Sequence, residues 1–157
     1  MTAASQLVGA VALLGTGAIY GFDVFAALVL RSALAEVDDR ALTEVMGQVH
    51  RYGDRRLAIP SALGLIATGV AVVVSALAGS GAAAVASGVA FGAQALWLAV
   101  YGRVSVPVNR QLTEAARAGR VPPDTRQLQG RWDRAIGIRL PLQVVAVVAL
   151  CTALALA

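Results

Sequence analysis

The chain has 157 residues, of which 58% are hydrophobic and only 14% are charged. A soluble domain carries about 25% charged residues, and a chain this short cannot bury so many apolar side chains. The composition therefore excludes an ordinary soluble domain and a disordered chain, and the single cysteine excludes a disulfide scaffold. All 13 basic residues are arginines and the net charge is +4, which points to nucleic acid or to a membrane surface.

Four apolar stretches occur at residues 7–30, 57–78, 81–102 and 135–157. A helix needs about 20 mostly apolar residues to cross the hydrocarbon core, and an uncharged run of that length indicates a helix rather than a barrel strand. The turn Gly79-Ser80-Gly81 joins the second and third stretches, so these two form an antiparallel hairpin. The sequence thus predicts an all-α fold, a four-transmembrane-helix bundle formed by one integral membrane domain over residues 1–157.

The first stretch could instead be a cleaved signal peptide, because Ala33-Leu34-Ala35 resembles a cleavage site. However, no basic residue precedes the stretch, and it is longer than the roughly 7–15 apolar residues of a signal core. We therefore expect it to be retained as the first membrane helix.

The arginines orient the bundle. Five lie between the first two stretches and seven between the last two, and the two ends of the chain and the Gly-Ser-Gly turn carry none. The positive-inside rule places both long loops in the cytoplasm and both termini outside the cell membrane. Acidic residues such as Glu36 and Glu114 are interspersed, which favours contact with the lipid bilayer over nucleic acid as a partner.

Both loops are expected to be largely helical. Asp38 is a candidate N-cap for a helix with Leu42, Met46 and Val49 on one face. After Pro122-Pro123, Asp124 is expected to cap a helix that continues into the fourth span, with Gln127 at the capping-box position. Helices two and four should therefore extend into the cytoplasm.

The two halves of the chain share a plan. The loops contain the similar strings Arg40-Ala41-Leu42-Thr43-Glu44 and Arg110-Gln111-Leu112-Thr113-Glu114, and each following helix contains a proline, Pro60 or Pro141. A parallel repeat about an axis along the membrane normal would produce this pattern. Chance similarity is an equal alternative, because so few residues match.

Asp23 and Arg139 are the charges inside the predicted spans, and both lie in the cytoplasmic half, where they could meet. Ionisable groups at membrane depth mark functional sites by default. There are two alternatives: the two residues form a purely structural ion pair, or Arg139 snorkels to the headgroups. Further polar and aromatic residues share helical faces with them and are candidates for substrate binding: Tyr20, Gln94, Trp97, Tyr101, Trp132 and Gln143. Small and hydroxyl residues are expected to mediate helix packing instead: Ser61, Thr68, Ser75, Gly17-x-x-x-Gly21 and Gly88-x-x-x-Gly92.

His50 and Asp54 are four residues apart, a spacing that suits a metal pair or an imidazole base oriented by a carboxylate. An exposed histidine that faces water is an equal alternative. One histidine and one cysteine are too few for a closed metal site, so no metal is expected. No nucleotide-binding or dinucleotide-binding motif occurs, so no cofactor is expected, and Cys151 is interpreted as an apolar filler.

Pro107 and Asn109 form a P-x-N string after the third stretch, and Trp132 precedes Arg139 by seven residues. With the first loop through His50 and Asp54, this pattern resembles the family of small four-helix membrane proteins that includes the fungal anthrone oxygenases and many bacterial proteins. Asp23 is not part of the family pattern, so its role depends on the membrane argument alone.

The resemblance implies oxygenation of an activated aromatic carbon by O2 without metal or flavin, which converts an anthrone to a quinone. In that chemistry His50 or Asp23 would act as the base, and Arg139 and Asn109 would stabilise the oxyanion. Trp132, Trp97 and Tyr101 would supply flat walls for a hydrophobic small-molecule substrate. The alternatives are a small proton-coupled transporter that uses Asp23 and could be a homo-oligomer, and a non-catalytic accessory membrane protein.

Overall fold

The computed structural model describes residues 3–157, and no strand occurs among them. Met1 and Thr2, which the predicted domain also includes, lie outside the described residues. The first apolar stretch forms one continuous rod that contains α1 (Ala3–Phe25), a π-helical turn η1 (Ala26–Leu30) and α2 (Arg31–Ala35). The second forms α3 (Asp39–Arg56) and α4 (Ala58–Leu77), separated at Leu57.

The third rod contains α5 (Gly81–Val100), a second π-helical turn η2 (Tyr101–Ser105) and α6 (Val106–Arg117). The fourth is the single helix α7 (Thr125–Leu156). Four helical segments are long and apolar enough to cross a membrane: Ser5–Ala35, Ala58–Leu77, Gly81–Arg117 and Thr125–Leu156. The outer surface of these helices carries large apolar side chains that are more than half exposed, such as Leu14, Leu77 and Val85. The all-α four-helix bundle is confirmed, and its length and composition are those of a multi-pass membrane protein.

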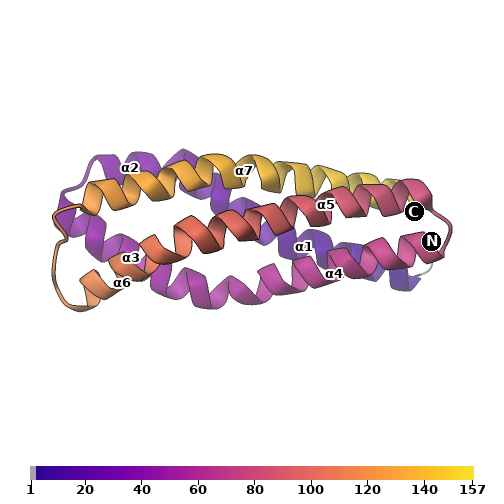
Figure 1. The fold of residues 1–157 in the computed structure, drawn as a ribbon, viewed down its shortest axis with the longest axis horizontal. Helices are drawn as coiled ribbons and strands as arrows, with labels where there is room; N and C mark the ends of the chain where they lie inside the picture. Colours follow the sequence, from indigo (N-terminus) through magenta and orange to yellow (C-terminus); the bar gives the residue numbers. More distant parts are fainter. Residues whose placement is uncertain (1–2) are drawn as a thin grey trace.

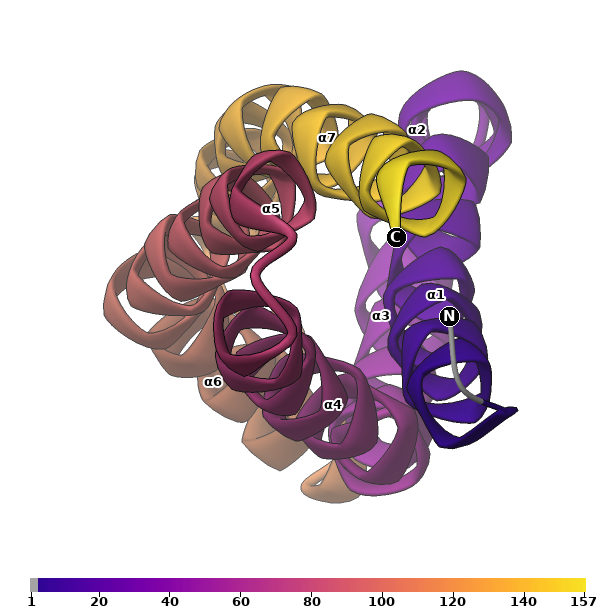
Figure 2. The same ribbon diagram turned by 90° about the vertical axis from the view of Figure 1, so that its right-hand side faces the viewer.

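The bundle is elongated, with the chain termini and the α4–α5 turn at one end (Figure 1). The α2–α3 and α6–α7 connections lie at the other end, which we call the arginine-rich end and which holds α2, α3, α6 and the first half of α7. Viewed along its axis, the bundle is a ring in the order α1, α4, α5 and α7, in which each helix contacts its two neighbours (Figure 2). At the arginine-rich end α3 packs against α6.

The predicted extension of the second and fourth helices is correct, but it is incomplete because the first and third helices also extend. The third continues through Pro107 to Arg117. Pro107 falls in the first turn of α6, directly after η2, where a missing backbone N–H is tolerated. Asp38 caps α3 as expected, since its Oδ1 accepts from the Ala41 N–H at 2.8 Å. The prediction for Asp124 is wrong in detail, because among the described residues its side chain makes no capping hydrogen bond.

The glycines that bring helices together are not those of the two G-x-x-x-G strings. A Cβ added at Gly17, Gly21, Gly88 or Gly92 would meet no atom of the described residues within 4 Å, so the prediction that these strings pack helices within this chain is wrong. Close approaches to the backbone of a neighbouring helix occur at Gly15 with Gly64, which joins α1 to α4, and at Gly47, which joins α3 to α6.

The α3–α6 contact can be tested at Gly47. A Cβ at this position would lie 2.3 Å from the Ala116 Cβ and 2.8 Å from the Leu112 carbonyl oxygen. We expect Gly47→Ala to destabilise the protein by about 1–3 kcal/mol, because the two helices must separate. The measurement is thermal unfolding in detergent micelles.

Gly53→Ala is the matched control on the same helix, because a Cβ there would meet none of the described atoms within 4 Å. It should be neutral or stabilise the protein by about 0.5–1 kcal/mol, since alanine is the better helix former. Equal unfolding temperatures for the two variants would contradict the close contact between α3 and α6.

Candidate functional site

A buried ion pair joins α1 to α7 in the interior of the bundle. Arg139 Nη2 donates to Asp23 Oδ1 at 2.6 Å, and the two residues are 2% and 0% exposed. Trp97 Nε1 donates to the other carboxylate oxygen at 2.8 Å, and Arg139 Nη1 donates to Ser105 Oγ at 3.0 Å. The expected meeting of Asp23 and Arg139 is confirmed, and the alternative that Arg139 snorkels to the surface is wrong.

Aromatic rings cover the guanidinium of Arg139. Its Cζ lies 4.7 Å from the Trp97 ring centroid and 5.4 Å from that of Tyr101. The two rings are parallel within 5°, with their centroids 5.2 Å apart. Cation–π attraction is strongest where water is excluded, so these rings help to fix the guanidinium in place.

Asp54 connects α3 to the third rod. Its Oδ1 accepts from Tyr101 Oη at 2.7 Å and from Asn109 Nδ2 at 2.8 Å. The sequence had paired Asp54 with His50 by helical spacing, but no hydrogen bond between them occurs among the described contacts. Asp54 instead orients the Asn109 amide, because the nitrogen donates to the carboxylate and leaves the oxygen Oδ1 free for another donor.

His50 is buried, and the alternative of an exposed, water-facing histidine is therefore wrong. Its ring centroid lies 5.4 Å from that of Trp132, with the planes inclined at 58°. Burial disfavours the imidazolium, and the positive charge of Arg139 disfavours it further, so the pKa of His50 falls to about 3. The imidazole is neutral at physiological pH.

A cavity of about 300 Å³ lies among these groups. Its wall includes six of the predicted site residues: His50, Trp97, Tyr101, Asn109, Trp132 and Arg139. The rest of the wall is mostly apolar and comes from α1, α3, α4 and α5, with Ile19 and Phe22 as the contributions of α1. An apolar cavity with a few convergent polar groups is the usual form of a small-molecule site.

Four residues of this wall each have a buried polar atom without a hydrogen-bond partner among the described residues. The atoms are His50 Nε2, Asn109 Oδ1, Trp132 Nε1 and Arg139 Nε. Such atoms cost about 1–3 kcal/mol each when they stay unpaired. Because these four atoms line one cavity, a molecule or ordered water inside it could complete their hydrogen bonding.

The other predicted residues lie beside the cavity or away from it. Asp23 stands behind the wall, and Gln94 and Gln143 line an adjoining void of about 20 Å³. Gln94 Nε2 donates to Thr68 Oγ1 at 2.9 Å, which supports the prediction that Thr68 mediates packing. Tyr20 is on the wall of neither this cavity nor the adjoining void. Cys151 is exposed in the half of α7 near the termini, so it is not a filler of the interior.

Two polar contributors were missed by sequence reasoning as site residues. Asp54 was considered only beside His50, although its contacts are to Tyr101 and Asn109. Ser105 was missed because it lies three residues beyond the end of the third apolar stretch, and a single serine there carries no signal of its own. It reaches Arg139 from the π-helical turn η2, a deviation that the sequence pattern does not show.

No group of three or more His, Cys, Asp and Glu side chains in the described part of the chain could hold a metal ion. Comparison of the chain with protein-family models, curated proteins and solved structures gave no match. The resemblance to the anthrone oxygenases therefore stays a prediction.

The ion pair can be tested with three variants. Arg139→Met and Asp23→Leu should each destabilise the protein by about 3–5 kcal/mol, because each leaves a buried charge without its partner. The double variant should lose less than either single variant, since no uncompensated charge remains. Thermal unfolding in detergent measures all three, and a double variant as unstable as the sum of the two single changes would argue against direct pairing.

The state of His50 can be tested by pH. Its pKa is lower in the folded protein than the value of 6.5 for an unperturbed histidine, so its neutral form stabilises the fold above pH 6.5. This stability is lost as the pH falls from about 6.5 towards 3, at about 1.4 kcal/mol per pH unit. We expect the unfolding temperature of the parent to fall over this window more steeply than that of His50→Gln. Identical pH profiles for the two proteins would show that His50 is not buried in its neutral form.

Proposed function

We propose that this chain is an integral membrane enzyme that oxidises a polycyclic phenolic substrate of the anthrone type with O2 and without a cofactor. The observation that carries the proposal is the set of four unpartnered polar atoms on the wall of one apolar cavity. All four residues also belong to the segments that carry the resemblance to the anthrone oxygenases: His50 to the first loop, and Asn109, Trp132 and Arg139 to the pattern after the third helix.

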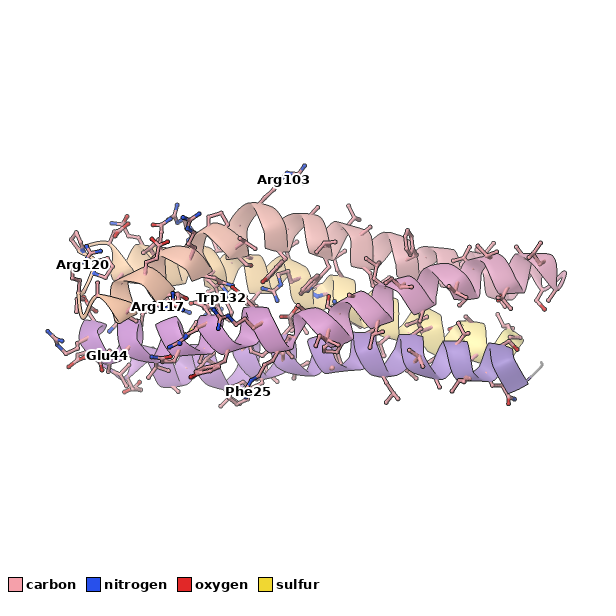
Figure 3. The ribbon with its side chains drawn as sticks, turned by 90° about the horizontal axis from the view of Figure 1, so that it is seen from below. Phe25, Glu44, Arg103, Arg117, Arg120 and Trp132 are labelled. Carbon is pink, nitrogen blue, oxygen red and sulfur yellow. The ribbon has the colours of Figure 1, made fainter. Side chains whose placement is uncertain are left out.

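The proposal includes the orientation of the protein in the cell membrane. The arginine-rich end would face the cytoplasm and both termini would lie outside, because the interhelical arginines all belong to the α2–α3 and α6–α7 side. Arg103 and Arg120 project from the bundle, whereas Trp132 lies among the helices (Figure 3). The exposed arginines would contact anionic headgroups, and the cavity would lie near the level at which hydrocarbon meets headgroups.

The cavity suits a flat molecule that carries a few oxygens. Trp97, Tyr101 and Trp132 offer ring surfaces to fused aromatic rings. The Nε–H groups of Trp132 and Arg139 would donate to substrate oxygens, and Asn109 Oδ1 would accept from a phenolic hydroxyl. A substrate of this kind dissolves in the bilayer, which also concentrates O2.

His50 is the proposed base. In the neutral imidazole, Nε2 can accept the proton from the CH2 carbon between the two aryl rings of the substrate. The electron pair of the broken C–H bond then delocalises onto the substrate carbonyl oxygen, where Arg139 stabilises the developing negative charge. Before the reaction, burial and the positive charge of Arg139 keep the pKa of His50 low. The negative charge of the enolate compensates the charge of Arg139. The imidazolium of His50 therefore becomes more favourable as the enolate forms.

The electron-rich carbon then reduces O2 directly. A C–O bond forms, the distal oxygen becomes a peroxide anion, and this anion takes the proton from His50. The hydroperoxide next loses water, which carries away the distal oxygen and the second hydrogen of the original CH2. The net reaction converts CH2 and O2 into C=O and H2O, so one oxygen atom enters the product and the carbon is oxidised by four electrons.

Asp23 is assigned a positioning role and not that of the base. Both of its carboxylate oxygens already accept hydrogen bonds, from Arg139 and Trp97, and it does not belong to the cavity wall. The same contacts disfavour the alternative of a transporter that uses Asp23 as the coupling carboxylate, because protonation would break the pair with Arg139.

The proposal can be tested with purified protein in lipid nanodiscs that receive anthrone. We expect O2 uptake and quinone formation at equal rates, with one oxygen of isotopically labelled O2 in the quinone. His50→Gln should lower the rate by about 10²–10⁴-fold, the usual contribution of a general base.

Cys151→Ser, at the opposite end of the bundle, is the control and should react as the parent does. The function is wrong if the parent oxidises anthrone no faster than empty nanodiscs do. The assignment of the base is wrong if His50→Gln retains the parental rate.

A further inference from the structure

The cavity reaches the outer surface of the bundle on one side. Ala58 and Ala62 of α4 and Leu98 of α5 line the cavity, and all three are also exposed at the surface. Ala58 and Ala62 are one helical turn apart and so share a face of α4. Their small side chains leave the cavity wall open at this point, whereas the α1 side is closed by Ile19, which is 4% exposed.

The two helices that flank this opening diverge towards the arginine-rich end. The turn Gly79-Ser80-Gly81 holds α4 and α5 together near the termini, and their axes move apart in the direction of α3 and α6 (Figure 1). The opening therefore lies in the half of the bundle that contains the cavity.

The residues around the opening are apolar on α4 and α5, whereas the preceding helix α3 carries a charged residue. Ile59 and Leu63, which flank the two alanines on α4, are 67% and 52% exposed, and Leu98 is 46% exposed. These residues belong to segments apolar enough to cross a membrane. The exposed Asp54, on α3, also lines the cavity, about one helical turn before Ala58, and it holds Tyr101 and Asn109.

We propose that the gap between α4 and α5 at Ala58, Ala62 and Leu98 is a lateral entrance through which a membrane-dissolved amphiphile passes from the bilayer into the cavity. Lipid covers an apolar rim of this kind, so the entrance opens to hydrocarbon rather than to water. The inference rests on the proposed function for the orientation of the arginine-rich end, but not for any step of the chemistry.

The entrance determines which molecules can reach His50 and Arg139. A compound that enters by this route must first partition into the bilayer, so the entrance does not admit sugars, nucleotides or metal ions. It must also carry its polar group at the end that faces Asp54 and Asn109, because the rim on the α4 side offers apolar contacts. Substrate specificity is thus set in part by membrane solubility, before any contact inside the cavity.

The chain contains two tryptophans, Trp97 and Trp132, and both line the cavity. Their fluorescence therefore reports directly on what enters. We would reconstitute the protein in phosphatidylcholine vesicles and add dibrominated stearyl alcohol, a neutral amphiphile that partitions into the bilayer and quenches tryptophan by contact. Ala62→Phe should reduce the quenching about twofold or more, because a phenyl ring fills the gap that alanine leaves.

Ala76→Phe is the matched control, since it makes the same substitution at an exposed position of α4 that borders none of the described cavities. It should be quenched as the parent is. Ala58→Phe is a second blocking variant, which keeps the test decisive if Ala62→Phe does not fold. Equal quenching in the parent, the control and both blocking variants would overturn the entrance. The quenching assay needs no turnover, so it can be read even if the protein does not oxidise anthrone. Conversely, the oxidation assay can be read even if the variants show no change in quenching.

Discussion

The structure depends on the buried contact between Asp23 and Arg139. Two opposite charges in an apolar bundle are far more costly apart than together, so the pair fixes α1 against α7. Trp97 binds the carboxylate and Ser105 binds the guanidinium, which brings in α5 and η2. Tyr101 stacks on Trp97 and reaches Asp54, which in turn holds Asn109. A single chain of contacts thus connects the core of the bundle to the edge of the cavity.

Both π-helical turns occur where their rods leave the apolar part of the bundle. Such turns shift the direction in which the following side chains point, and they are frequent at functional sites. The turn η2 contains Tyr101 and Ser105, which face Arg139 together, whereas η1 begins three residues after Asp23. The equivalent position of the two turns in the two halves agrees with an internal repeat, which stays a prediction.

The sequence was sufficient for the four spans, because hydrophobic length is a property of the chain itself. It also placed Asp23 and Arg139 in the same half of the bundle, where they could meet, but only the structure shows that they pair. It was insufficient where neighbouring helices decide the outcome. His50 follows Met46 by one turn on the buried face of α3, and Trp132 of α7 packs beside it, so the packing of the bundle decides its burial. Gly47, not the G-x-x-x-G strings, brings helices together, because only the packed bundle determines which small residues face a neighbour. The continuous third rod was not predicted, because the apolar run ends at residue 102 and the helix continues beyond it through Pro107.

The distribution of satisfied and unsatisfied groups limits what the cavity can hold. The carboxylates of Asp23 and Asp54 accept from neighbouring side chains, and both terminal nitrogens of Arg139 donate to the protein. The unpartnered atoms of the wall are single N–H groups, an amide oxygen and a neutral imidazole nitrogen. A strongly charged ligand would therefore find no free counter-charge, and its desolvation would go uncompensated. A neutral molecule with separate hydroxyl and carbonyl groups can instead hydrogen-bond to these atoms. Negative charge then develops on it only during the reaction, where Arg139 can stabilise it.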